Sequence, residues 1–354
     1  MKSPCLKIPK ISGQKAIEIV RQLEIYNKSL KIEQKGSYLY VPLLREPMEK
    51  ERIAVKKVVQ NGEFVVHDFS MLISRPKNFV ELLSEELPPH LIASLPRSAD
   101  FVGDIAVVEI PTELDVHKHK IGEAILTTNK RVRTVLAKVS AIGGVYRTRK
   151  FQLIAGEPKT VTAHREYGCI FYVDLAKAYF SPRLSSEHAR VARLVNEGET
   201  ILDMFAGVGP FAVQIARLHE KVRVYAVDVN PDAVEFLNKN IAANRVLAKV
   251  TPVLGDVREV VHDRFAGVAD RVIMNLPEKA IEYVDVACEA LKSTGGIMHY
   301  YAFTEASEPP KTAEIRLVEA TEKAHRKVDK IIGFRTVRAT APYTWQVVVD
   351  AKIR

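Results

Sequence analysis

The chain has 354 residues, 47% of them hydrophobic, and 52 Lys and Arg against 43 Asp and Glu give a net charge of +9. This length suggests two or three domains, and no apolar run approaches the roughly 20 residues of a membrane span or forms the core of an N-terminal signal peptide. Three scattered cysteines without a CxxC pair argue against a disulfide framework or a zinc site, so we expect a cytoplasmic protein without a metal or a membrane anchor.

Residues 1–68 are expected to form a small α/β module. Apolar side chains share one face of a predicted helix over 13–23, for which Ser12 is a candidate cap. Strand-like runs follow at SLKIEQ, SYLYVPLL and EFVVHDF. The segment 70–77, which contains a proline, is a predicted linker.

A second module is expected over 69–165. FVELLSEEL and LIASLP predict short helices, FVGDIAVVEIP a strand pair, KHKIGEAILTT a helix, and VRTVLAKVSA, TRKFQLIAGE and KTVTAHREYG successive strands. We therefore predict short helices mixed with antiparallel strands. Residues 124–156 carry seven basic side chains and no acid, and residues 1–60 carry 13 basic against 6 acidic. A charge run can be a solvated face, but two such segments favour an extended polyanion as partner.

Strand and helix alternate in the third region, 166–354. A strand is predicted over 168–175 and a helix over 185–196 with Ser185 or Ser186 as its cap, and the alternation continues through GGIMHYYAF and PPKTAEIRLVEATEKAHRKV. Such a pattern is typical of a doubly wound parallel sheet. Two final strand runs around Ala341-Pro342 have no helix between them, which predicts an antiparallel hairpin at the sheet edge.

A glycine turn organises this third region. TILDMFAGVGPFAVQIARLHEKVRVYAVD reads as strand, turn, helix and strand, with Gly207 and Gly209 in the turn, Pro210 opening the helix, and Asp228 at the end of the second strand. In a βαβ unit, an acid about 20 residues past the glycines meets a ribose diol. The stretch therefore predicts a nucleoside-cofactor site.

The glycine pattern alone also fits a dinucleotide, so other residues must decide which cofactor binds. Asp203 stands before the turn, Asp256 closes the next strand where it could meet an adenine amino group, and Asn275-Leu276-Pro277 ends the fourth strand. Together with the terminal hairpin, these features resemble a class I S-adenosylmethionine-dependent methyltransferase. The resemblance implies a Rossmann-like α/β catalytic domain preceded by two smaller α/β or α+β modules.

Asn275-Leu276-Pro277 is similar to the Asp/Asn/Ser-Pro-Pro-Tyr/Phe turn of amino-group methyltransferases that act on nucleic acid bases. The aromatic position is occupied by Glu278, which disfavours a stacked adenine or cytosine. Alternatively, Asn275 only caps a strand-to-helix turn.

A longer set of motifs narrows the family. AHREYGCIFYVDLAKAYFSPRLSSEHARVA, DMFAGVGPFAVQIA, AVDVNPDAVEFLNKNIAANRV and NLPEKA resemble the archaeal and eukaryal tRNA (guanine-37-N1)-methyltransferases. The resemblance implies methyl transfer to N1 of guanosine 37 in tRNA, with modules 1–68 and 69–165 contacting the RNA. We expect a monomer without an obligate protein partner. The alternatives are aminocarboxypropyl transfer, or additional methylation, in wyosine-type tRNA modification. A non-catalytic tRNA-binding factor would leave the intact motifs unexplained. A small-molecule methyltransferase would leave the basic modules unexplained.

Guanine N1 carries a hydrogen, so its methylation needs a base, a donor near O6 and a positioning acceptor. The resemblance implies Glu187 as the base, although an exposed capping-box glutamate would look the same. It implies Arg147 at O6, with Arg149 as the neighbouring candidate and phosphate contact as the alternative for both. It also implies Asn275 with Pro277 as the positioning turn, and Tyr179 in the substrate pocket unless that side chain is core packing.

The same resemblance gives a cofactor set. It comprises His188, Phe205, Gly207, Gly209, Asp228, Val229, Asp256, Val257 and Asn275. His188 could instead face solvent. Arg183 and Arg190 are further candidates for RNA or loop contacts.

Overall fold

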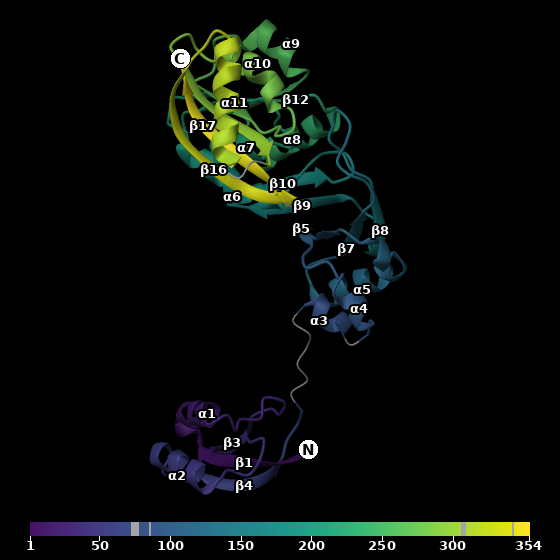
Figure 1. The fold of residues 1–354 in the computed structure, drawn as a ribbon, viewed down its shortest axis with the longest axis vertical. Helices are drawn as coiled ribbons and strands as arrows, with labels where there is room; N and C mark the ends of the chain where they lie inside the picture. Colours follow the sequence, from purple (N-terminus) through teal and green to yellow (C-terminus); the bar gives the residue numbers. More distant parts are fainter. Residues whose placement is uncertain (72–77, 85, 306–308, 342) are drawn as a thin grey trace. The chain divides into compact units, whose positions relative to one another are not determined.

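The computed structural model describes residues 1–71, 78–84, 86–305, 309–341 and 343–354. The chain divides into two compact units, Met1–Lys77 and Asn78–Arg354, each drawn in Figure 1. The predicted linker 70–77 lies, from residue 72 on, outside the described residues, as does Pro342, which the sequence places between the last two strand runs.

The first unit packs two helices on an antiparallel sheet with strand order β2-β3-β1-β4. Its elements are β1 (Lys2–Pro9), η1 (Lys10–Ser12), α1 (Gly13–Gln22), β2 (Glu33–Lys35), β3 (Tyr38–Pro42), α2 (Glu49–Val58) and β4 (Glu63–Asp68). Sequence patterning missed the central strand β1, because Pro4 and Pro9 are rare inside sheets, and it missed α2. Ser12 precedes α1 but makes no side-chain capping bond, so the predicted cap is wrong.

The second unit begins with a mixed sheet, β5-β6-β7-β8. The elements of this part of the unit are α3 (Phe79–Ser84), α4 (Pro89–Ile92), β5 (Asp100–Val102), β6 (Ile105–Val108), η2 (Thr112–His117), α5 (Lys118–Thr128), β7 (Thr134–Lys138) and β8 (Phe151–Gly156). The prediction of antiparallel strands is wrong at one point, because β6 and β7 run parallel. Helix α5 joins them as the crossover that parallel strands require.

The strand predicted over 168–175 does not join the large sheet. β10 (Cys169–Asp174) instead pairs antiparallel with β9 (Val161–Glu166). The other edge of β10 is covered by two buried asparagines, Asn240 in α8 (Pro231–Ala243) and Asn244 directly after it. Asn240 accepts from the Tyr172 amide at 2.7 Å, and Asn244 accepts from the Ile170 amide at 2.9 Å. These amide side chains replace a neighbouring strand, since an unpaired buried backbone is costly.

The large sheet has, over the described ranges, the order β13-β12-β11-β14-β15-β17-β16. Its elements are η3 (Pro182–Leu184), α6 (Ser185–Leu194), β11 (Thr200–Asp203), α7 (Pro210–Leu218), β12 (Arg223–Asp228), β13 (Val250–Leu254), α9 (Val257–Val260), η4 (Val261–Phe265), β14 (Arg271–Met274), η5 (Ala280–Tyr283), α10 (Val284–Ala290), β15 (Gly296–Thr304), α11 (Pro309–Lys323), β16 (Val328–Ala341) and β17 (Thr344–Ile353). The first five strands pair in parallel and β17 pairs antiparallel with β15 and β16. The predicted doubly wound sheet with a terminal hairpin is confirmed.

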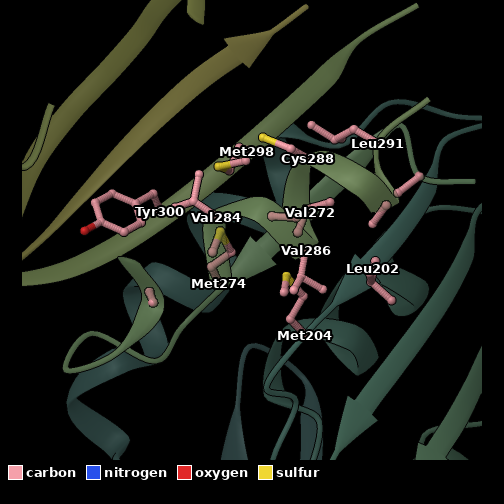
Figure 2. Packing of buried hydrophobic residues seen from close by; sticks show 14 of the residues in the cluster. Leu202, Met204, Val272, Met274, Val284, Val286, Cys288, Leu291, Met298 and Tyr300 are labelled. Carbon is pink, nitrogen blue, oxygen red and sulfur yellow. The ribbon is translucent and has the colours of Figure 1, made fainter. Parts of the chain in front are cut away.

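Two apolar clusters fill the two faces of this sheet. One joins α9, α10 and α11 to Leu202, Val272 and Met298, and Figure 2 shows its close packing, with sulfur atoms among the aliphatic side chains. The other joins α6, α7 and α8 to Ile201 and Tyr301. Helices on both faces leave the carboxyl ends of the parallel strands as the place for a ligand.

Candidate active site

The glycine turn after β11 has the geometry that its sequence predicts. Gly207 and Gly209 have φ of +56° and +88°, a region that side chains with a Cβ rarely adopt. The amide of Gly207 donates to Oδ2 of Asp228 at 2.6 Å, and Oδ1 accepts from the Asn230 amide at 2.9 Å. The carboxylate at the end of β12 is thereby fixed beside the turn.

A cleft of about 340 Å³ opens at this edge of the sheet. Of the residues proposed from sequence, those that line it are Arg147, Tyr179, His188, Phe205, Gly207, Asp228, Val229, Asp256, Val257 and Asn275. The described lining does not include Glu187, Gly209 or Pro277. Gly209 instead shapes the turn, because a Cβ there would lie 2.3 Å from Cδ1 of Leu237.

Acidic and amide side chains stand at the ends of neighbouring strands. Asp256 follows β13, Asp228 ends β12, and Asn275 follows β14, with the glycine turn between them. Asp256 caps α9 through one oxygen, which accepts from the Arg258 amide at 2.9 Å. One exposed acid, one fixed acid and an open glycine backbone fit the amino group, ribose and amino-acid end of S-adenosylmethionine.

Asp203 lies beneath the turn rather than in the cleft lining. Its side chain is fully buried and neither oxygen has a hydrogen-bond partner among the described residues. Burial, with the nearby charge of Asp228, raises the pKa of Asp203 to about 8. A neutral carboxyl group at neutral pH follows from this environment.

Arg147 and Tyr179 come together at the cleft. The Arg147 guanidinium lies 5.6 Å from the centre of the Tyr179 ring and pairs with Glu278 at 2.7 Å. Arg149, the alternative candidate, lines an adjoining cavity, and its Nε is buried without a partner among the described residues. Sequence reasoning assigned Glu278 no partner, because 131 positions separate it from Arg147.

The Asn275 side chain bonds across the sheet. Its Oδ1 accepts from Nε2 of Gln346 on β17 at 3.4 Å, so the described hydrogen bonds do not make it a cap of the following turn. Pro277 acts through its backbone, whose carbonyl accepts from the Phe303 amide at 3.1 Å. The turn is thus tied to both β15 and β17.

Glu187 is neither exposed nor part of a capping box. Helix α6 begins at Ser185 with Leu184 as its N-cap residue, and no side chain caps it, so the predicted serine caps are wrong. The Glu187 carboxylate is fully buried and accepts from the Tyr301 hydroxyl and from Nη2 of Arg190, both at 2.6 Å. Arg190 is therefore an internal ion-pair partner rather than the predicted RNA or loop contact.

The ion pair of Glu187 continues into a buried polar network. Arg190 also contacts Asp350 at 2.5 Å. Nδ1 of His299 donates to Oδ1 of Asp350 at 2.5 Å, because Nε2 of the same ring faces the donor-only guanidinium of Arg271. Burial would raise the pKa of Asp350, but His299 and Arg190 outweigh it and hold that pKa at about 2. Burial lowers the pKa of His299. One guanidinium is thus shared by two carboxylates.

His188 lies one position along α6 and faces inward. Its ring is 2% exposed, with Nδ1 3.1 Å from Glu166 and its centre 4.6 Å from that of Phe211. The solvent-facing alternative for His188 is wrong. Arg183, by contrast, is half exposed and pairs with Asp100 at 2.5 Å.

Sequence reasoning missed other parts of the cleft wall. These include the loop Gly144, Val145 and Tyr146, Leu184 at the end of η3, Phe211 of α7, and Lys279 and Tyr283 after the asparagine turn. The glycine pair before Tyr146 was the available signal for a loop. No described helix is long and apolar enough to cross a membrane, and no group of three potential metal ligands occurs in the described ranges.

Comparisons with known proteins match nearly the full length of the chain. The family model "TRM5/TYW2 methyltransferase domain" matches residues 162–329, "TYW2 N-terminal domain" matches 79–160, and "tRNA methyltransferase 5 N-terminal domain" matches 5–51. The tRNA (guanine(37)-N(1))-methyltransferase Trm5b of Pyrococcus abyssi is 37% identical over 98% of both chains.

A solved structure and a second relative add detail. The complex of aTrm5 with tRNALeu has a TM-score of 0.81 and 33% identity, and the match covers 99% of both chains. The tRNA(Phe) (4-demethylwyosine(37)-C(7)) aminocarboxypropyltransferase of Methanocaldococcus jannaschii is 33% identical, with 71% of this chain and 96% of its own covered.

Proposed function

Because this chain belongs to the TRM5/TYW2 methyltransferase family, we propose that it methylates N1 of guanosine 37 in tRNA with S-adenosylmethionine. The observation that carries this choice is coverage. Similarity to the guanosine-37 enzyme spans 98% of the chain, whereas similarity to the aminocarboxypropyltransferase spans 71%. The separate first unit also matches the N-terminal domain of tRNA methyltransferase 5.

The cofactor supplies an electrophilic methyl group on its sulfonium. Asp228 would hold the ribose hydroxyls, because its two oxygens are already oriented by backbone amides and keep further lone pairs. Asp256, beside Val257, would accept from the adenine amino group. His188, Phe205 and the Gly207 backbone would line the amino-acid end, and Val229 the ribose side.

Glu187 is our proposed base for the N1 proton. Its carboxylate is paired with Arg190 at 2.6 Å, which it shares with Asp350, and lies 3.9 Å from Nε of Arg335. A carboxylate can accept the N1 proton, and this is the role that the family motif implies for Glu187. Glu187 does not line the described cleft. Its carboxylate therefore reaches a guanine in the cleft only after its contact with Arg190 loosens.

The remaining roles concern the guanine. Arg147 would offset the negative charge that develops on O6, with Tyr179 as the ring beneath it and Asn275-Leu276-Pro277 as the positioning turn. We assign Arg149 to contact with the phosphates or the backbone of the RNA. Glu278 is the competing base, since its carboxylate lines the cleft.

For the modules, we propose that residues 1–68 and 69–165 bind tRNA, with 166–354 as the catalytic domain. Their basic segments support this. We also propose that the enzyme is cytoplasmic and works as a monomer. Its three cysteines are buried and free within the described structure, as a reducing compartment would keep them.

The test is methyl transfer from labelled S-adenosylmethionine to tRNA transcripts with G37 or A37, followed by nucleoside mass analysis. N1-methylguanosine from G37 alone is the expected product, and kcat should fall at least about 100-fold in Glu187→Gln. Glu278→Gln should keep most of the activity. The opposite pattern would make Glu278 the base, an aminocarboxypropyl mass would move the chain to the wyosine reaction, and no transfer to any tRNA would refute the proposal.

A further inference from the structure

A chain of hydrogen bonds leads from the terminal hairpin to the cleft. Arg338 on β16 stands opposite Gln346 on β17 in the sheet register. Nε of Arg338 donates to Oε1 of Gln346 at 2.8 Å, and Nε2 of Gln346 donates to Oδ1 of Asn275 at 3.4 Å. Gln346 is 1% exposed, so solvent does not compete for its amide.

The guanidinium fixes the direction of both amides. Arginine has donors and no acceptor, so the group that Gln346 turns toward Arg338 must be its oxygen. The Gln346 NH₂ group then faces Asn275, so the side-chain oxygen of Asn275 must accept its hydrogen bond. The NH₂ of Asn275 is left over, and the described hydrogen bonds include none from it, while Asn275 itself lines the cleft.

Arg338 is itself held from more than one side. Its Nη1 donates to Oγ of Ser181 at 3.2 Å, and its Nη2 to the Tyr179 hydroxyl at 3.3 Å. Tyr179 therefore accepts from Arg338 and keeps its own hydrogen for another partner. With Arg147 nearby, this wall of the cleft offers donors from several side chains.

We propose that Arg338 and Gln346 are specificity-determining residues, which act by fixing the Asn275 amide with its NH₂ toward the substrate base. This inference rests on the proposed function. A purine with an oxygen at C6 accepts from that NH₂, whereas the 6-amino group of adenine brings a second donor against it and leaves both unpaired. A mismatch of this kind should favour guanine by about tenfold or more.

The decisive variant is Gln346→Glu. A carboxylate at this position still pairs with Arg338 but has no donor for Asn275, so the Asn275 amide must turn its NH₂ toward Glu and its oxygen toward the cleft. We would measure kcat/KM for G37 tRNA and the inhibition constant of A37 tRNA as a competitor. The preference for G37 should fall at least about tenfold, with the Kd of S-adenosylmethionine within about twofold of wild type.

Two further variants separate orientation from general damage. Arg338→Lys keeps a donor-only group opposite Gln346 and should retain most of the preference, whereas Arg338→Met should lose it. This pair also tests the inference if Gln346→Glu does not fold. Gln152→Glu, on the exposed face of β8, adds the same charge away from the cleft and should leave the preference unchanged.

The outcomes distinguish this inference from the proposed function. If wild type methylates G37 but Gln346→Glu or Arg338→Met keeps the wild-type preference, the orienting role is wrong and the proposed function stands. Equal losses in Arg338→Lys and Arg338→Met would also overturn it. If wild type methylates no tRNA, both ideas fail.

Discussion

Arg147 and Glu278 form an ion pair of 2.7 Å at the cleft, although 131 positions separate them along the chain. Arg147 lies in a loop with φ of +53°, and Glu278 follows the Asn275-Leu276-Pro277 turn. Both side chains line the cleft. A base that approaches the turn must therefore meet a guanidinium that a carboxylate already neutralises.

Replacing Glu278 by Gln should free Arg147 for the substrate. The Glu278 side chain is 49% exposed, so the pair contributes at most about 1 kcal/mol to folding and the melting temperature should change little. Without the competing charge, KM for tRNA should fall a few-fold at low salt, with kcat close to wild type. Glu86→Gln is the matched control, since Glu86 is 44% exposed and pairs with Lys120 at 2.9 Å away from the cleft. A higher KM would show that Glu278 itself binds the RNA.

The buried Asp203 should make stability depend on pH in an unusual direction. Its pKa of about 8 lies above the value of about 3.9 expected in the unfolded chain. The native state therefore binds more protons between these values, and its stability should decrease as pH rises from about 4 to 8. Asp203→Asn cannot ionise and should remove this slope in urea unfolding series at pH 5, 7 and 8.5. An unchanged slope in the variant would rule out Asp203 as its source.

Asp350 should act in the opposite sense. Its pKa of about 2 lies below the unfolded value, so its contribution is present above about pH 4 and lost as pH falls toward 2. The lowered pKa of His299 adds a loss of stability as pH falls below about 6.5. Asp350→Asn should cost about 3 kcal/mol at pH 7, because Arg190 and His299 lose a buried charged partner.

Asp329→Asn provides the control for this network. Asp329 is partly exposed and pairs with Lys352 at 3.5 Å and Arg354 at 3.8 Å, so its loss should cost less than about 1 kcal/mol. Guanidinium unfolding obscures ion pairs, so urea is the denaturant to use. Similar losses in the two variants would mean that the buried network contributes no more than a surface pair.

Local sequence signals predicted which residues meet around the glycine turn, where we propose that the cofactor binds. Gly207 and Asp228 lie within one βαβ unit, so spacing alone brings the turn and the acid together, and the Gly207 amide bonds that acid directly. The doubly wound sheet followed from the alternation of strands and helices for the same reason. The strand predicted at 168–175 is present, but it pairs with β9 and not with the large sheet. Periodicity identifies a strand but does not show which neighbouring strand it pairs with.

The proposed base-binding half of the site depends on contacts between distant segments. Glu187 pairs with Tyr301 at a separation of 114 residues, and Asn275 with Gln346 at 71. No spacing rule relates such positions, and a buried glutamate and a capping glutamate have the same local sequence. Family resemblance suggested Glu187 and Asn275 as candidates, whereas the contacts of Gln346, Arg338 and Asp350 could be recognised only in the folded sheet.

The final prediction compares two glycines with similar backbone and different surroundings. Gly209 and Gly168 have φ of +88° and +79°, so an alanine at either position meets the same left-handed strain of roughly 1–2 kcal/mol. At Gly168 a Cβ would meet nothing within 4 Å, whereas at Gly209 it would lie 2.3 Å from the buried Leu237. Gly209→Ala should therefore cost about 3 kcal/mol or more, since overpacking adds about 1–3 kcal/mol, and it should weaken S-adenosylmethionine binding because the turn carries the amide that fixes Asp228. Gly168→Ala should cost only the strain and leave cofactor affinity unchanged. Urea unfolding and cofactor titration of both variants would check this, and equal losses in the pair would mean that backbone strain alone explains the glycine at 209.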